Sequence, residues 1–225
     1  MTQPNALPLT QVVVFDGFDD LDAIAPLEVL TAAGFPTRVV RPAGHPTAVP
    51  STTAPSATVH PLTVRSAHGL VLEVADELGA PELVVVPGGG WLDDAPGVRD
   101  QCEGPLPGVL AALHDAGTVV ASVCTGAMLL ARAGLLSGRP AVTNRNALDD
   151  LAAAGADVRR DARVVDDGSV ITAGGPAAGI DLAIRLVARF AGEEAARQAA
   201  ARLEHEPVGP VLVGVEAAST ASPLP

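Results

Sequence analysis

The segment around Cys124 holds the residue types best suited to covalent chemistry in this chain. Residues 119–123 are a run of small and β-branched apolar residues, which predicts a buried strand. Cys124 follows directly, and Thr125 and Gly126 lead into an apolar helix that is closed by Gly134. A tight turn from strand to helix, with small residues around the reactive group, is a nucleophile elbow, which lifts the side chain above the edge of the sheet.

In such an elbow the sulfur of Cys124 meets the free N–H groups and the positive end of the following helix. This setting lowers a thiol pKa from about 8.5 to about 3.5–7.5, so we expect a thiolate at neutral pH. A second interpretation stays open, in which Cys124 is a buried core residue at the end of a strand. Cys102 lies in a polar turn and is interpreted as a bystander thiol, and two cysteines so far apart do not indicate a disulfide framework.

Two more groups are predicted to lie at neighbouring strand ends. Asp22 falls at the start of a helix predicted over residues 21–33, where it serves either as an acid or base facing the thiol or as a helix-capping charge. Gly88, Gly89 and Gly90 follow a short buried strand. Their backbone N–H groups can approach a bound atom closely, as an oxyanion hole requires, although a plain tight turn has the same composition.

Strands and helices alternate along the chain, which is typical of an α/β fold. Strands are predicted over residues 11–15, 37–41, 69–74, 83–86, 119–123, 141–143, 158–165 and 169–172, and helices over 21–33, 106–116, 127–134, 177–191 and 193–203. Residues 43–61 are rich in Pro, Thr, Ser and Ala and form a long excursion. Strands that are apolar throughout imply a mostly parallel sheet with helices on both faces, a three-layer sandwich. Ligands of such sheets bind beyond the carboxyl ends of the strands, where Cys124 and Asp22 both fall.

The chain length of 225 residues suits a single domain with a full core, and no internal repeat is visible. We expect the domain to span residues 10–207, with a flexible N-terminal tail over residues 1–9 and a C-terminal tail over residues 208–225.

Composition narrows the function classes. The formal net charge is -12 and lysine is absent, which excludes a lysine Schiff base and makes a nucleic-acid partner unfavourable. No signal peptide and no apolar run of about 18 residues is present, so a cytoplasmic protein without a membrane partner is expected. No His/Cys cluster has metal-ligand spacing, and the glycines of residues 174–179 do not match the dinucleotide fingerprint, so neither a metal nor a cofactor is expected. The five histidines are interpreted as solvated side chains.

Four motifs occur in order along the chain. The first predicted helix contains Leu21-Asp22-Ala23-Ile24-Ala25-Pro26, and a later strand ends in Pro-Gly-Gly. The elbow Ser122-Val123-Cys124-Thr125-Gly126 comes third, and Thr172-Ala173-Gly174-Gly175-Pro176 with the residues that follow comes fourth. Together they resemble the DJ-1/PfpI superfamily over roughly residues 10–207. The resemblance implies a flavodoxin-like sandwich with a cysteine elbow, and a homodimer.

Cys124 followed by Thr125, with Asp22 in the first helix, is most similar to the isocyanide hydratase branch, in which the equivalents of these three are the functional residues. The chain departs from that branch after the elbow helix. The relatives usually show Thr-Thr-His-Trp there, whereas this chain has Asn144 and Arg145 in the last two positions. By the family pattern these two should approach the thiol and offer amide hydrogen bonds and a fixed positive charge, unless Arg145 points outward into solvent.

The resemblance implies an enzyme that adds water to a small-molecule isocyanide, R–N≡C, and forms an N-substituted formamide. Cys124 would attack to give a thioimidate, Asp22 would move protons, Thr125 would orient water or substrate, and the backbone donors of the glycine run would steady developing charge. Two alternatives stay open. One is another thiol reaction on a small substrate, such as carbonyl hydration or amide hydrolysis, and the other is a non-catalytic redox or ligand sensor.

Overall fold

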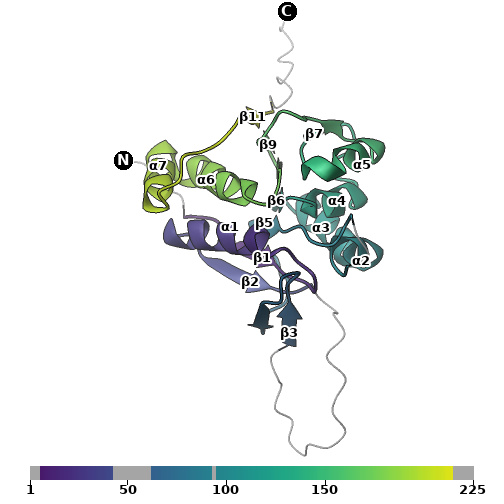
Figure 1. Cartoon of the computed structure of the whole chain (residues 1–225). Helices are drawn as coiled ribbons and strands as arrows, with labels where there is room; N and C mark the ends of the chain where they lie inside the picture. Colours follow the sequence, from purple (N-terminus) through teal and green to yellow (C-terminus); the bar gives the residue numbers. More distant parts are fainter. Residues whose placement is uncertain (1–5, 43–61, 93–94, 215–225) are drawn as a thin grey trace, which may run out of the picture.

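The computed structural model describes residues 6–42, 62–92 and 95–214. The predicted excursion over residues 43–61 therefore lies outside the described residues. Figure 1 shows a central sheet with helices on both sides, which is the α/β sandwich predicted from the alternation of strands and helices and the flavodoxin-like architecture implied by the family resemblance. Among the described residues, no helix combines the length and the apolar character needed to cross a bilayer.

The central sheet has seven strands in the order β11-β9-β10-β6-β5-β1-β2. Their bounds are β1 (Thr10–Val13), β2 (Thr37–Val40), β5 (Leu83–Val86), β6 (Val119–Val123), β9 (Val164–Asp167), β10 (Val170–Ala173) and β11 (Val211–Val213). From β2 to β10 every neighbouring pair is parallel, and β9 runs antiparallel to β10. The carboxyl ends of β1, β5 and β6 therefore meet at one edge, as the largely parallel arrangement predicted.

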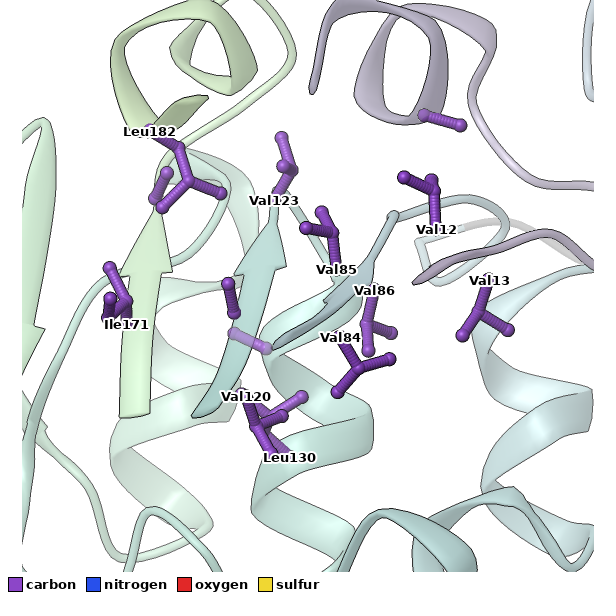
Figure 2. Close-up of a cluster of buried hydrophobic side chains, with 14 of the residues drawn as sticks. Val12, Val13, Val84, Val85, Val86, Val120, Val123, Leu130, Ile171 and Leu182 are labelled. Atoms are coloured by element: carbon purple, nitrogen blue, oxygen red, sulfur yellow. The ribbon is translucent and has the colours of Figure 1, made fainter. Parts of the chain in front are cut away.

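Alternate side chains of the strands fill the two faces of the sheet, because successive residues of a strand point to opposite sides. Figure 2 shows Val12, Val85 and Val123 on the same side of the sheet as Leu182, and Val120 on the opposite side beside Leu130. All six are fully buried, so both faces of the sheet are covered.

The helices form the two outer layers of the sandwich. One layer holds α1 (Asp20–Ala32), α6 (Ala178–Ala191) and α7 (Glu193–Arg202); the other holds α2 (Val98–Glu103), α3 (Leu106–Asp115), α4 (Gly126–Arg132) and α5 (Leu148–Ala153) (Figure 1). The stretch predicted as one strand over residues 158–165 is divided in the structure. Its first residue belongs to β8 (Asp157–Val158), which pairs with β7 (Pro140–Ala141), and its end belongs to β9. The polar residues 159–163 interrupt the apolar run and place a turn between the two.

A two-stranded antiparallel hairpin, β3 (Leu62–Arg65) and β4 (Val71–Val74), lies beside the loop that joins β1 to α1. The N–H of Gly17 donates to the carbonyl of Arg65 at 2.8 Å, and the N–H of Ala67 donates to the carbonyl of Phe18 at 2.8 Å. These backbone bonds tie the hairpin to the carboxyl-end edge of the sheet. The sequence predicted its second strand but not its first.

The C-terminal tail predicted from residue 208 is wrong for the residues that form β11. Val211–Val213 pair in parallel with β9, and Val211 lies opposite Val164. Three consecutive apolar residues between Pro and Gly are enough to complete a ladder at an open sheet edge. At the other end of the chain, the N–H of Leu9 donates to Glu82 Oε2 at 2.8 Å. Residues 1–5 and 215–225 lie outside the described part.

Candidate active site

Cys124 sits at a strained turn between β6 and α4, in agreement with the predicted nucleophile elbow. Its φ is +54°, a left-handed conformation that costs a residue other than glycine about 1–2 kcal/mol. The N–H of Cys124 donates to the carbonyls of Ala173 at 3.1 Å and Gly174 at 3.0 Å. The hydroxyl of Thr143 donates to the Cys124 carbonyl at 2.7 Å. The end of β10 and Thr143 therefore hold the elbow in its strained shape.

Asp22 is completely buried in the first turn of α1. Its Oδ2 accepts the N–H of Gly88 at 3.0 Å, and no described residue makes a hydrogen bond to its Oδ1. A Cβ on Gly88 would lie 2.7 Å from this Oδ2, so only glycine allows so close an approach. Burial raises the pKa of Asp22 to about 8, helped by the negative charge of Asp19 and opposed by the hydrogen bonds to Gly88 and Cys124. The carboxyl is therefore protonated near neutral pH.

The sulfur of Cys124 and one carboxylate oxygen each of Asp22 and Asp19 all lie within 4.8 Å of one another. Three such atoms are near enough to ligate one metal ion, a grouping that the sequence did not predict because Cys124 is about a hundred residues from the two aspartates. A protonated Asp22 is a poor metal ligand, because a carboxyl group must lose its proton to bind. The chemistry of this donor set fits proton transfer to and from sulfur better than metal binding.

The prediction that the elbow lowers the thiol pKa is wrong. Burial raises the pKa of Cys124 to about 12, and the charge of Asp22 adds to the rise. The hydrogen bonds from the Asn144 amide and the Thr125 N–H act in the opposite direction but are weaker. Only 3% of Cys124 is exposed, so a thiolate there is strongly desolvated. The N-terminus of the seven-residue helix α4 stabilises the thiolate by less than this desolvation destabilises it.

Asn144 and Arg145, the two positions at which the chain departs from its relatives, point in different directions. The Oδ1 of Asn144 accepts the N–H of Asn146 at 3.0 Å, so the amide NH₂ must face the other way. There it donates to the sulfur of Cys124 at 3.2 Å. Arg145 begins the 3₁₀ turn η1 (Arg145–Ala147) and is exposed, so the structure does not bring its predicted positive charge to the thiol.

Thr125 and the glycine run are tied together by reciprocal hydrogen bonds. The Thr125 hydroxyl accepts the N–H of Gly89 at 3.0 Å and donates to the Gly89 carbonyl at 2.9 Å. The N–H groups of Gly88 and Gly89 are thus already engaged by Asp22 and Thr125. The oxyanion hole predicted from these two glycines does not fit, and they position side chains instead. Gly90 lines the pocket described next.

A pocket of about 860 Å³ opens above Cys124 and Thr125. It is walled by the loop after β1, the β3–β4 hairpin, the loop after β5 and the elbow. Its lining includes the acidic Asp16 and Asp19 and the basic Arg65 and His68. The volume and the convergent polar groups are those of a small-molecule site.

Sequence reasoning missed the part of the site that the hairpin contributes. Ser66 Oγ donates to Asp20 Oδ1 at 2.7 Å, and His68 Nδ1 lies 2.8 Å from Asp20 Oδ2. His68 is solvent-exposed, as predicted, yet it forms part of the pocket wall, and its hydrogen bond to Asp20 raises its pKa. Gly175 was also missed: a Cβ there would lie 2.3 Å from the Cys124 sulfur, so its backbone packs against the thiol. The acidic run before α1 and the paired glycines after β10 were the available signals.

The sequence model of the DJ-1/PfpI family matches residues 10–189 of this chain. The chain belongs to the DJ-1/PfpI family. Among curated relatives, isonitrile hydratase of Pseudomonas putida is 43% identical over 91 residues, a match that covers 40% of each chain. The Parkinson disease protein 7 homolog of Danio rerio is 27% identical over 196 residues and covers 85% of this chain and 94% of that relative.

Solved structures share the fold. DJ-1beta of Drosophila melanogaster superimposes with a TM-score of 0.72 at 21% identity, covering 88% of this chain and 97% of that one. A ThiJ/PfpI family protein from Pseudomonas syringae gives a TM-score of 0.71 at 23% identity, covering 93% of this chain and 80% of that one.

Proposed function

We propose that this protein is a cysteine-dependent hydratase that adds water to an isocyanide and releases an N-substituted formamide. The observation that carries the proposal is the pairing of the Cys124 thiol, which lines the pocket, with a buried, protonated Asp22 that has a carboxylate oxygen within 4.8 Å of the sulfur. The partial match to isonitrile hydratase, at 43% identity, supports the same reaction class.

In the first step the sulfur of Cys124 attacks the electrophilic isocyanide carbon and a C–S bond forms. Asp22 gives its carboxyl proton to that carbon, and the thiol proton passes to Asp22, which ends the step neutral again. The product is a thioimidate, Cys–S–CH=N–R. This route requires no free thiolate beforehand, which fits a thiol whose pKa is raised to about 12.

In the second step water adds to the thioimidate carbon, giving up one proton to a base in the pocket, and Asp22 protonates the nitrogen. The resulting tetrahedral adduct collapses: the C–S bond breaks, the hydroxyl proton returns to Asp22, the departing sulfur takes up the proton that water gave up, and the formamide leaves. The Asn144 amide, 3.2 Å from the sulfur, stabilises the negative charge that develops there during collapse.

The proposal is tested by formamide production from alkyl and aryl isocyanides, followed by chromatography. We expect Cys124→Ala to abolish turnover and Cys102→Ala to preserve it, because the Cys102 sulfur lies outside the lining of this pocket. Intact-mass spectrometry of the wild type should also show an adduct equal to the mass of the isocyanide.

Absence of formamide from every isocyanide, or full activity of Cys124→Ala, would overturn the proposal. Stoichiometric oxidation of Cys124 by peroxide, with no turnover of any isocyanide, would favour the sensor alternative instead.

A further inference from the structure

The water-addition step needs a base, and Asp22 is unsuited to that task. Its carboxyl is completely buried, so burial raises its pKa to about 8 and it keeps its proton near neutral pH. Asp22 can therefore donate a proton to the thioimidate nitrogen, but it becomes a base only after that proton has left. A group near the sulfur that is ionised from the start is better suited to accept the proton of the attacking water.

Asp19 is placed to be that group. It directly precedes α1 and lies in the lining of the pocket, and one of its carboxylate oxygens is within 4.8 Å of both the Cys124 sulfur and an Asp22 oxygen. Its side chain is 30% exposed, so it stays in contact with pocket water, whereas Asp22 has no exposed surface.

The electrostatic effect of Asp19 agrees with this position. Its negative charge raises the pKa of both Asp22 and Cys124, which means that it acts on them as an ionised carboxylate. Two carboxyl groups in unlike surroundings, one dry and protonated and one wet and ionised, are the arrangement in which an acid and a base work side by side.

The geometry assigns Asp19 as the general base that takes a proton from the water attacking the Cys124 thioimidate, with Asp22 as the acid. This inference rests on the proposed function and divides its proton transfers between two carboxyl groups. Sequence reasoning gave no role to Asp19, which it passed over as part of an acidic run.

The transfers balance. A water proton moves to Asp19, the oxygen bonds to the thioimidate carbon, and the C=N electron pair takes the proton of Asp22. On collapse the hydroxyl proton goes to the Asp22 carboxylate and the C–S bond breaks. The departing sulfur takes the proton held by Asp19. Thiol, neutral Asp22 and ionised Asp19 are all restored, and the net reaction is R–N≡C plus H₂O giving R–NH–CHO.

The test separates the two half-reactions by rapid-quench mass spectrometry with an isocyanide that the wild type turns over. Asp19→Asn should still form the adduct on Cys124, but the adduct should decay about 10² to 10⁴ times more slowly, because hydrolysis has lost its base. Asp22→Asn should instead fail to form the adduct. Asp19→Glu should recover part of the decay rate.

The matched control is Glu28→Gln, which removes one negative charge from an exposed position of the same helix. It should leave both half-reactions unchanged, and so tests whether net charge alone slows the adduct. Adduct decay in Asp19→Asn at the wild-type rate would overturn the assignment while leaving the hydratase proposal intact. Wild-type protein that forms neither adduct nor formamide would overturn both.

Discussion

Among the described residues, buried aspartates occur in two regions, and their partners differ. Asp166 and Asp181, 2% and 4% exposed, lie where β9 meets α6. Asp166 binds Arg185 at 2.8 Å and Arg189 at 3.0 Å, while Asp181 binds Arg163 at 2.8 Å and has His205 Nε2 at 2.8 Å. Beside Cys124, by contrast, none of the described arginine or histidine side chains bonds to Asp22.

The comparison separates a structural use of a buried carboxylate from a chemical one. Next to arginines, a buried aspartate forms ion pairs, and these fasten α6 and the C-terminal segment to the sheet. Asp22 has no cation beside it, so its protonated form is the more stable one. An ionised carboxylate at this position would lose its hydration without gaining an ion pair. A buried acid with a proton to give, beside a thiol, has the properties of a catalytic group.

The largest expected difference between Asp22 and the arginine-bound aspartates is in catalysis. Asp22→Asn should lower kcat on a turned-over isocyanide by about 10² to 10⁴ while the circular dichroism spectrum stays native, because the amide keeps the size but carries no transferable proton. Asp166→Asn, measured in parallel, should leave kcat per folded molecule unchanged. A large loss of kcat in both variants would break the distinction.

The reverse pattern is expected for stability. Asp166→Asn should lower the free energy of unfolding by about 2–3 kcal/mol in urea titrations, because it leaves Arg185 and Arg189 without their carboxylate. The figure is below that for a fully buried pair because the two arginine side chains are partly exposed and screened by solvent. Arg197→Ala, which removes an exposed ion pair with Glu194, is the control and should change stability by less than about 1 kcal/mol.

Stability should depend on pH through Asp22 with a definite sign. Its pKa is about 8 in the folded protein against an ordinary value of 3.8, so the folded state holds a proton that the unfolded state releases. The stabilisation is complete below about pH 4 and is lost as pH rises to about 8, at about 1.4 kcal/mol per pH unit. Urea titrations of wild type and Asp22→Asn should therefore diverge in this window; parallel profiles would mean that Asp22 is ionised in the fold.

A smaller effect is expected from Asn144, whose neutral side-chain amide, rather than a cation, donates a hydrogen bond to the Cys124 sulfur. Asn144→Ala removes a 3.2 Å hydrogen bond to the Cys124 sulfur and should raise the thiol pKa by about one unit. The measurement is the pH dependence of iodoacetamide alkylation in a Cys102→Ala background. A fall in the pKa would show that the amide opposes the thiolate.

The smallest effect is expected at Arg145. Its side chain is exposed, so Arg145→Leu should leave both KM and the thiol titration unchanged within error. A tenfold rise in KM would instead show that this cation reaches the substrate, and the pocket would no longer differ from the arginine-rich region.

Much of the fold and the centre of the site follow from local sequence pattern. Apolar runs broken by turn residues predict the strands, and parallel strands bring their carboxyl ends together, so the sequence pattern predicts Cys124, Asp22 and Thr125 at one edge of the sheet. The short strand β11 was missed, because it is stabilised by pairing with β9, which lies far away in the sequence. The first strand of the hairpin was missed although its partner β4 is the next strand along the chain.

The sequence by itself determined that Cys124 and Thr125 lie at the edge of the sheet where the pocket opens, since that depends on periodicity and on the tight turn at Cys124. The tertiary structure alone decided their chemical states. Whether the thiol pKa rises or falls, whether Asp22 keeps its proton, and whether the Gly88 and Gly89 N–H groups stay available depend on burial and on partners from distant segments. Desolvation and hydrogen bonding act through space, so no pattern along the chain records their balance.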